Sequence, residues 1–251
     1  MPERGGPDVP KEPPLLDRLR AALSVAATDP RVRVLTGAVL LLGLLALALL
    51  VRTAEMTEHD LHVDELIRPW RTTALTGVFI ALTSAASEVV GLGALAVGVA
   101  VLTARRRRRD AIRLLAMAGS SWALALVVKD VVGRPRPPAA LWALAPDPSG
   151  SFPSGHDTTA CVLVLVVLTV VPRRARIGAV IAALLFAAAV GVSRVYLGDH
   201  YPTDVLGSWL TVATGAVLAL LVLDLPTVRR VVHRIVRDPR AVMLLQERDA
   251  A

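Results

Sequence analysis

Hydrophobic residues along this chain come in long blocks separated by short polar stretches, rather than in the stripes of a soluble helix. The first block, 34–51, is long enough to cross a bilayer. Five more cover about 89–102, 111–128, 157–171, 177–192 and 205–223. The apolar stretch 77–88 is interrupted by Thr, Ser and Glu, which favours an interfacial or re-entrant helix. We therefore predict an all-α polytopic membrane protein with six transmembrane helices and an additional interfacial helix.

Composition and charge support a membrane protein and give it an orientation. The 251 residues are 54% hydrophobic, with a mean hydropathy of +0.58. The formal net charge of +7 is concentrated in arginine runs such as 105–109 and 173–176. With only 4% aromatic residues and the arginines beside apolar blocks, nucleic acid is the weaker explanation of this charge. The runs and both terminal segments fall on one face of a six-span topology, and the positive-inside rule makes that face cytoplasmic.

Four segments follow from this pattern. The segment 1–33 is rich in Pro and charge and is expected to be a disordered cytoplasmic segment. The first transmembrane helix and an extracytoplasmic loop occupy 34–71, the remaining apolar blocks occupy 72–223, and 224–251 is a basic cytoplasmic tail. We expect a multi-pass protein of the plasma membrane, and the compact chain with its arginine-rich turns favours a bacterial one.

Three polar clusters fall on the opposite, extracytoplasmic face. They are Lys129 to Pro137 with Arg134 and Arg136, then Pro153, Ser154, Gly155 and His156, and finally Ser193 and Arg194 followed by His200 and Asp204. Any one of these cations is equally well explained as a helix-end anchor among lipid phosphates. Their association with two histidines favours a site that holds a phosphate group.

The spacing within the clusters indicates what the histidines can do. Gly155 and His156 stand at the start of an apolar block, where a helix offers free N–H groups and partial positive charge to an anion. His200 and Asp204 are four residues apart, so the carboxylate can reach the imidazole across one helical turn. Such a pair leaves the other ring nitrogen free to attack, although a purely structural helix-start pair has the same spacing.

A metal site is the competing chemical interpretation. His59, His62, His156 and His200 are possible ligands, but the nearby carboxylates are scattered among arginines that would repel a cation. We therefore predict no metal and no cofactor. Glu88 lies inside an apolar stretch, where an ionisable residue suggests function, but the sequence identifies no partner for it.

The three clusters resemble the motifs of the type 2 phosphatidic acid phosphatase (PAP2) superfamily, membrane lipid phosphatases related to vanadium haloperoxidases and bacterial acid phosphatases. The pattern Lys-x6-Arg-Pro is met by Lys129, Arg136 and Pro137, and Pro-Ser-Gly-His is met by 153–156. The pattern Ser-Arg-x5-His-x3-Asp is met by Ser193, Arg194, His200 and Asp204. Order and spacing agree throughout, so the resemblance covers 72–223 as a PAP2-like phosphatase core.

The resemblance implies a role for each matching residue. His200 would be the nucleophile that forms a phosphohistidine, Asp204 would orient it, and His156 would protonate the leaving oxygen and then activate water. The phosphoryl oxygens would be held by Lys129, Arg136, Ser154, Gly155 and Arg194. Asp157, directly after the second motif, is more acidic than expected there and is predicted to disfavour highly anionic substrates.

The function implied is hydrolysis of a lipid phosphate or diphosphate at the extracytoplasmic face. Candidate substrates are a polyprenyl diphosphate, phosphatidic acid and phosphatidylglycerol phosphate. The polyprenyl diphosphate is slightly favoured, only because the site is expected on the extracytoplasmic side of the membrane. The alternatives are a metallophosphatase and a non-catalytic membrane protein whose basic pocket binds a lipid phosphate without cleaving it.

Overall fold

The structure is a computed structural model that describes residues 29–146 and 148–237, and all regular structure within these ranges is helical. The predicted segment 1–33 falls almost wholly outside the described residues, and so does the part of the predicted tail after residue 237.

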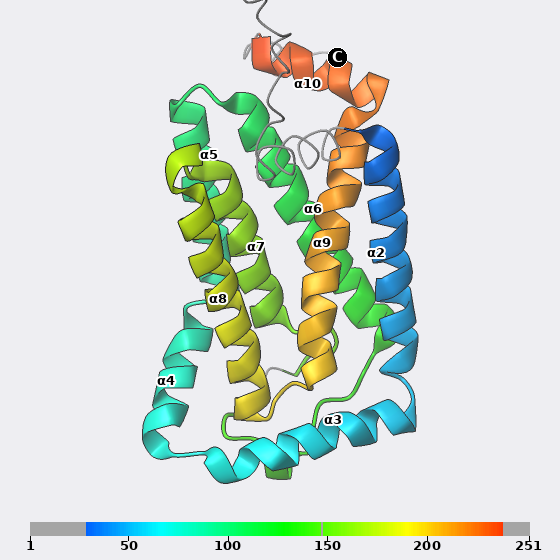
Figure 1. Ribbon diagram of the computed structural model, residues 1–251, viewed down its shortest axis with the longest axis vertical. Coiled ribbons are helices and arrows are strands. Elements are labelled where there is room, and N and C mark those ends of the chain that lie inside the picture. Colours follow the sequence, from blue (N-terminus) through cyan, green and yellow to red (C-terminus); the bar gives the residue numbers. More distant parts are fainter. Residues whose placement is uncertain (1–28, 147, 238–251) are drawn as a thin grey trace, which may run out of the picture.

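In the described part of the chain, six helices run alongside one another as a bundle, and two shorter helices cross its ends (Figure 1). Within the bundle α9 packs against α6 and α2, while α7 packs against α8 and α5. The bundle consists of α2 (Pro30–Leu50), α5 (Glu88–Ala104), α6 (Arg108–Val132), α7 (Gly155–Val170), α8 (Arg173–Leu197) and α9 (Pro202–Asp224). One end is crossed by α3 (Ala54–Ile67) and the other by α10 (Pro226–Arg237). The connections include α4 (Thr73–Ser84) and the short 3-10 helices η1 (Arg68–Trp70) and η2 (Ala139–Leu141).

The membrane architecture predicted from the apolar blocks is confirmed, but the number of six spans is not. Among the described residues, four helices are long and apolar enough to cross a membrane: α2, α6, α8 and α9. The pair α4 and α5 makes a fifth span if the two helices are counted together, with a bend of 44° between them. At 16 residues, α7 is shorter than an ordinary span.

Two segments differ from the prediction. The segment expected to be an extracytoplasmic loop within 34–71 is mostly helical, because α3 occupies Ala54–Ile67. Thr53 caps this helix by accepting a hydrogen bond from the backbone N–H of Met56 at 3.2 Å. The expected helix 77–88 is also misplaced, because α4 ends at Ser84 and Glu88 begins α5. The polar residues Thr83, Ser84, Ser87 and Glu88 interrupt this apolar stretch, but hydropathy alone does not show that the helix breaks between Ser84 and Glu88.

Two bundle helices continue past the apolar blocks that predicted them. The helices α6 and α8 end where Gly133 and Gly198 adopt positive φ angles of 57° and 78°. Glycine takes this left-handed conformation without steric cost, so it commonly ends a helix. As a result Lys129 and Arg194 stand on the last helical turns, and their positions are fixed by rigid elements.

Small and hydroxylated residues let α6 and α9 approach closely. A side chain added at Gly215 would lie 2.6 Å from the backbone Cα of Ser121. The hydroxyl of Ser120 donates to the carbonyl of Gly215 at 2.6 Å, and that of Ser121 donates to the carbonyl of Val212 at 3.2 Å. Small residues with interhelical hydrogen bonds are typical of helix packing in membranes, where lipid removes the hydrophobic drive between helices.

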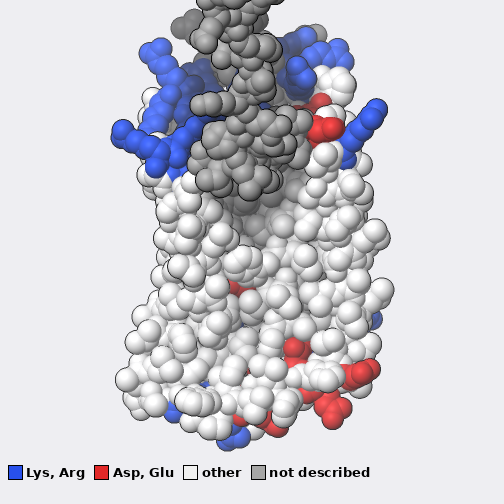
Figure 2. Space-filling model, in the orientation of Figure 1, with Lys and Arg blue, Asp and Glu red and all other residues white. Residues whose placement is uncertain are grey.

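Charged side chains are segregated to the two ends of the molecule. Figure 2 shows Lys and Arg gathered at the α10 end, a nearly uncharged middle, and most visible Asp and Glu at the α3 end. Apolar side chains on the outside of the middle region, such as Leu35 and Leu42 of α2, are 66% and 65% exposed. The uncharged band with exposed apolar residues is the surface expected to face lipid.

Candidate active site

The three sequence clusters meet at the α3 end of the bundle, around a pocket of about 410 Å³. Its lining joins the α4–α5 break, the end of α6, the loop before α7, the first turn of α7 and the α8–α9 connection. The lining residues are Ser87, Glu88, Val89, Lys129, Arg136, Ser149, Gly155, His156 and His200. Residues from all three clusters, which extend from Lys129 to His200 in the chain, therefore line the same pocket.

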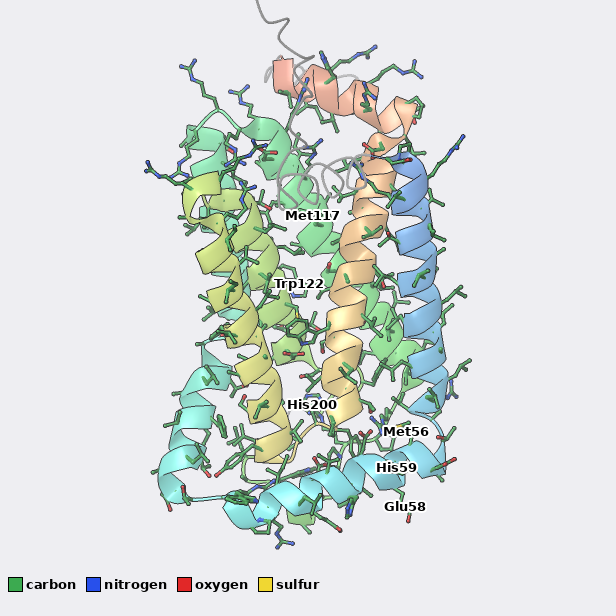
Figure 3. All side chains as sticks on the ribbon, viewed as in Figure 1. Met56, Glu58, His59, Met117, Trp122 and His200 are labelled. Atoms are coloured by element: carbon green, nitrogen blue, oxygen red, sulfur yellow. The ribbon has the colours of Figure 1, made fainter. Side chains whose placement is uncertain are left out.

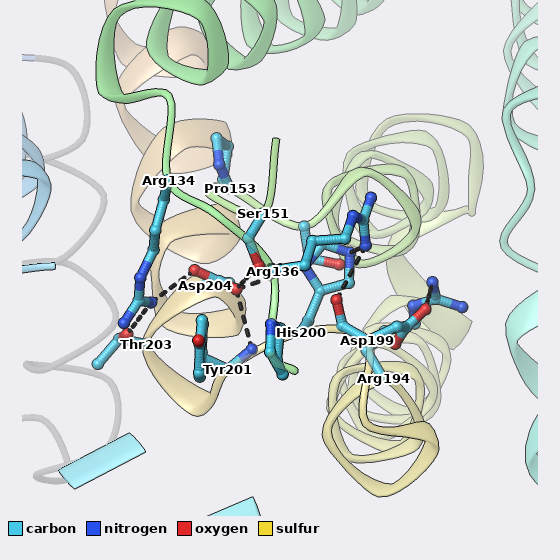
Figure 4. A network of polar contacts seen from close by, with 12 residues as sticks. Arg134, Arg136, Ser151, Pro153, Arg194, Asp199, His200, Tyr201, Thr203 and Asp204 are labelled. Atoms are coloured by element: carbon cyan, nitrogen blue, oxygen red, sulfur yellow. Dashed lines mark hydrogen bonds and ion pairs between the residues drawn. The ribbon is translucent and has the colours of Figure 1, made fainter. Parts of the chain in front are cut away.

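His200 lies in the tight connection between α8 and α9, near the α3 end of the bundle (Figure 3). It is 1% exposed, and its Nδ1 lies 3.4 Å from the Oδ2 of Asp204, one turn into α9. Its Nε2 lies 3.0 Å from the Nη1 of Arg136 (Figure 4). A guanidinium group can only donate, so Nε2 is the acceptor nitrogen and Nδ1 carries the proton toward Asp204.

The protonation state of His200 follows from its surroundings. Burial lowers the pKa of the imidazole to about 3, and hydrogen bonding to Asp204 opposes this shift only in part. The ring is therefore neutral at physiological pH, in the tautomer that leaves the Nε2 lone pair directed at Arg136 and the pocket. That is the form a nucleophilic histidine requires.

The carboxylate of Asp204 is held by several donors besides His200. Its Oδ2 accepts a hydrogen bond from the backbone N–H of Tyr201 at 2.9 Å and another from the hydroxyl of Ser151. Its Oδ1 accepts from the Nη1 of Arg134 at 2.8 Å. With 0% exposure and this many donors, the carboxylate has little freedom to rotate.

His156 and Gly155 line the pocket from the first turn of α7. A side chain added at Gly155 would meet no protein atom within 4 Å, so the backbone here borders open space on that side. Ser154 precedes them as the N-cap of α7 and is fully buried behind the pocket. Its hydroxyl has no hydrogen-bond partner among the described residues, which suits a donor kept for a ligand oxygen.

Lys129 and Arg136 are the cations that line the pocket among the described residues. The Nζ of Lys129 donates to the carbonyls of Gly150 and Pro153 at 2.7 and 2.8 Å, which ties the loop before α7 to the end of α6. Arg136 donates to the carbonyls of Ser149 and Asp199, each at 2.9 Å. Both side chains are therefore held in place at the pocket, and Arg136 contacts His200 directly.

Arg194 and Asp157 lie behind the pocket rather than in its lining. Arg194 is 3% exposed, forms an ion pair with Asp199 and donates to the hydroxyl of Thr83 at 2.9 Å. Asp157 is fully buried, and a side chain at Gly191 of α8 would lie 3.2 Å from its Oδ1. Asp157 is not among the residues that line the pocket and its carboxylate faces α8, so it has no direct contact through which to disfavour anionic substrates.

Three residues near the site were given no specific role in the sequence analysis. Ser151 contacts Asp204 directly, but it lies two positions before the Pro-Ser-Gly-His motif and outside it. Arg134 had been grouped with the pocket cations, yet it is buried between Asp204 and Asp60 of α3. Glu88 lines the pocket, so its position in an apolar stretch was an informative signal. By contrast, His59 and His62 are exposed on α3, and His59 lies apart from His200 (Figure 3).

An apolar helical bundle whose end holds two imidazoles, a buried carboxylate partner and convergent cations defines a membrane enzyme that acts on phosphate esters. The chain belongs to the PAP2 superfamily, whose family model matches residues 110–229.

Two curated relatives and one solved structure are similar to this chain. Phosphatidylglycerophosphatase B of Bacillus subtilis (strain 168) is 32% identical over an alignment of 181 residues, and the match covers 68% of this chain and 86% of the relative. An undecaprenyl-diphosphatase of Sulfolobus acidocaldarius is 30% identical over 157 residues, 60% of this chain and 72% of the relative. The crystal structure of a transmembrane PAP2-type phosphatidylglycerolphosphate phosphatase from Bacillus subtilis superposes with a TM-score of 0.66 at 28% identity. That superposition covers 74% of this chain and 94% of the other.

Proposed function

We propose that this protein is an integral membrane phosphatase that hydrolyses a lipid phosphate or diphosphate through a phosphohistidine on His200, without a metal ion. The observation that carries this proposal is the orientation of His200. Its protonated Nδ1 faces Asp204, and its Nε2 lone pair faces Arg136 and the pocket that His156 also lines. A nucleophile, a proton donor and fixed cations are the groups that phosphoryl transfer to histidine needs.

In the first step, Nε2 of His200 attacks phosphorus while the bond from phosphorus to the leaving oxygen breaks. Protonated His156 gives its proton to that oxygen, and the lipid leaves as an alcohol, or as a monophosphate when the substrate is a diphosphate. Asp204 stabilises the positive charge that develops on the imidazole. In the second step, His156 takes a proton from water, the water oxygen attacks phosphorus, and the P–N bond breaks. Inorganic phosphate leaves, and both histidines regain their starting forms.

The phosphoryl oxygens are held by charges and donors that the fold fixes in advance. Lys129, Arg136 and the N–H of Gly155 stand at the pocket, with Ser154 and Arg194 behind them. In the resting site Arg136 donates to Nε2 of His200, which occupies the lone pair needed for attack. Substrate oxygens compete for the same guanidinium, so substrate binding frees the nucleophile. Because three built-in cations supply the positive charge, the mechanism needs none from a metal.

The charges around the pocket bear on which lipid phosphate is preferred. The side of the membrane alone slightly favours a polyprenyl diphosphate. Among the described lining residues, however, two are cations and one, Glu88, is a carboxylate. A second phosphate adds negative charge that this carboxylate repels, so we place monophosphates such as phosphatidylglycerol phosphate and phosphatidic acid ahead of diphosphates.

We further propose that the active site faces the extracytoplasmic side and that both termini are cytoplasmic. The arginine-rich α10 end supports this orientation through the positive-inside rule (Figure 2). The buried Cys161 is the one cysteine of the chain, which simplifies a labelling test. In a Cys161→Ala background, a membrane-impermeant maleimide is expected to label Glu65→Cys on α3 in intact cells. Arg109→Cys at the other end is expected to react only after permeabilisation, and the reverse pattern would contradict the orientation.

The test of function is phosphate release from a panel of lipid phosphates by the purified protein in detergent. We expect activity that persists with a chelator, is inhibited by vanadate as a mimic of the transferring phosphoryl group, and is lost in His200→Ala. Activity abolished by the chelator would support a metallophosphatase instead. A wild type that binds lipid phosphates without releasing phosphate would support the non-catalytic alternative.

A further inference from the structure

The guanidinium of Arg134 connects two carboxylates that come from opposite parts of the chain. Its Nη2 lies 2.8 Å from the Oδ2 of Asp60 on α3, and its Nη1 lies 2.8 Å from the Oδ1 of Asp204 on α9. The side chains are buried, with 3%, 4% and 0% exposure for Arg134, Asp60 and Asp204. The guanidinium carbon also lies 4.0 Å from the ring centre of Tyr201, so the planar group is clamped against an aromatic face.

We propose that Asp60 is a positioning residue for the His200–Asp204 pair and that it acts through Arg134. This inference rests on the proposed function, because it assigns α3 a part in the same reaction. It gives a role to a helix that lies outside the sequence motifs and that crosses the end of the bundle at which His200 lies (Figures 1 and 3).

The first argument is geometric. Arg134 occupies Oδ1 of Asp204, which leaves Oδ2 for Ser151, the N–H of Tyr201 and His200 (Figure 4). A carboxylate held at one oxygen by a bidentate-capable guanidinium cannot rotate freely, so Oδ2 keeps facing Nδ1 of His200. Arg134 in turn is held by Asp60, since Nη2 points at α3 while Nη1 points at α9.

The second argument concerns charge. A buried arginine paired with Asp204 alone would cancel the negative charge that must stabilise the developing imidazolium on His200. Asp60 supplies a second carboxylate, so Asp60, Arg134 and Asp204 together carry a net charge of about −1 when both acids are ionised. Asp204 can then be fixed by a cation and still act as an anion toward His200.

The third argument is that Asp60 also binds the start of α9. Its Oδ1 accepts from the backbone N–H of Thr203 at 3.3 Å, and its Oδ2 accepts from the Thr203 hydroxyl. Thr203 directly precedes Asp204, in the first turn of α9, where backbone N–H groups have no intrahelical partner. Asp60 therefore contacts the backbone next to Asp204 as well as the arginine that holds it.

The test compares Asp60→Asn, which keeps the shape and removes the charge, with Glu65→Gln, a matched change of an exposed acid on the same helix. We expect Asp60→Asn to lower kcat by roughly 10- to 100-fold, the range seen when a partner that orients a catalytic group is lost, with KM changed less than about threefold. Glu65→Gln is expected to match the wild type. Equal kcat values for the two variants would overturn the proposal.

A double-mutant cycle separates positioning from a general structural effect. In an Asp204→Asn background Asp60→Asn should lower the residual activity by less than about threefold, because the group it positions is already changed. If it lowers that activity by the same factor as in the wild type, Asp60 does not act through Asp204 and the proposal is wrong.

Arg134→Lys provides a second route if Asp60→Asn does not fold. It keeps the charge but lacks the planar fork that reaches both carboxylates, so we expect the same fall in kcat at nearly constant KM. Monodispersity on size-exclusion chromatography checks folding in each case. If neither variant yields folded protein, the network is a folding element and the proposal is overturned. A wild type that releases no phosphate from any lipid contradicts the proposed function itself, whereas an active wild type with unaffected variants contradicts only the role of Asp60.

Discussion

The substitution Gly207→Ala should disturb the site from a position that touches neither substrate nor catalytic side chain. Gly207 lies on α9 where the helix passes Phe152, a fully buried residue of the loop before α7. An added Cβ would lie 2.6 Å from Cζ and 3.0 Å from Cδ2 of that ring. Ordinary contacts between carbon atoms are about 3.5–4.0 Å, so the ring must move by about 1 Å. Ser151, the neighbour of Phe152 in the chain, donates to Asp204 and would move with it.

The expected magnitude combines three effects. Overpacking costs about 1–3 kcal/mol of stability. Alanine in place of a helical glycine returns about 0.5–1 kcal/mol, so the net destabilisation is at most about 2.5 kcal/mol. A displacement of about 1 Å in catalytic geometry lowers activity by about 100-fold. We therefore expect a small fall in thermal stability together with a large fall in kcat.

The assay is phosphate release and thermal unfolding in detergent, with Gly119→Ala on α6 as the matched control. A side chain added at Gly119 meets no atom within 4 Å, so this variant should keep wild-type activity and be equally or slightly more stable. If Gly207→Ala matched Gly119→Ala in both measurements, the argument that Phe152 transmits packing to the site would be refuted.

Three further predictions follow from the buried and pocket-lining polar groups. Burial raises the pKa of Asp64 to about 8. Because this folded-state pKa lies above the unfolded value of about 3.9, Asp64 lowers the free energy of unfolding of the protein progressively as pH rises from about 3.9 toward 8. Asp64→Asn should therefore unfold at a higher temperature than the wild type, by a margin that grows from pH 5 to pH 8, whereas a less stable variant at pH 8 would mean that the acid is ionised and paired. Glu88→Gln should raise the ratio of diphosphate to monophosphate hydrolysis by about tenfold through loss of like-charge repulsion. The exposed Asp130→Asn, one residue from the pocket, should leave that ratio unchanged, and an equal shift in both variants would rule out a specific effect. Ser151→Ala removes one donor to Asp204 and should lower kcat by about tenfold, which unchanged steady-state kinetics would contradict.

Much of the fold could be predicted because lipid imposes a simple rule on sequence. A helix that faces hydrocarbon must be apolar for most of its length, so the apolar blocks of the sequence predicted the positions of α2, α6, α8 and α9. Hydropathy reports only the lipid-facing part, however. It placed the end of α6 before Lys129, whereas the helix continues to Val132 and ends at Gly133.

The helix α3 was missed because its inward face is acidic. Asp60 and Asp64 are its buried residues, while apolar Leu66 is 58% exposed. Periodicity searches expect apolar residues on the buried face of an amphipathic helix. Asp60 can be buried because Arg134, 74 positions away, supplies its counter-charge. A pairing over that distance in the chain leaves no local pattern, so only the folded structure reveals it.

The two arginines of the first cluster show most clearly what spacing can and cannot predict. Arg134 and Arg136 each precede a proline, and a residue before proline is driven toward extended or polyproline backbone. In polyproline geometry, with three residues per turn, side chains two positions apart diverge by about 120°. Figure 4 shows Arg134 directed toward Thr203 and Asp204 and Arg136 directed toward His200 and Asp199. Local sequence thus explains why neighbouring cations separate. Arg134 pairs with Asp60 and Asp204, which are 74 and 70 positions away in the chain, so local sequence does not predict which of the two cations reaches the pocket.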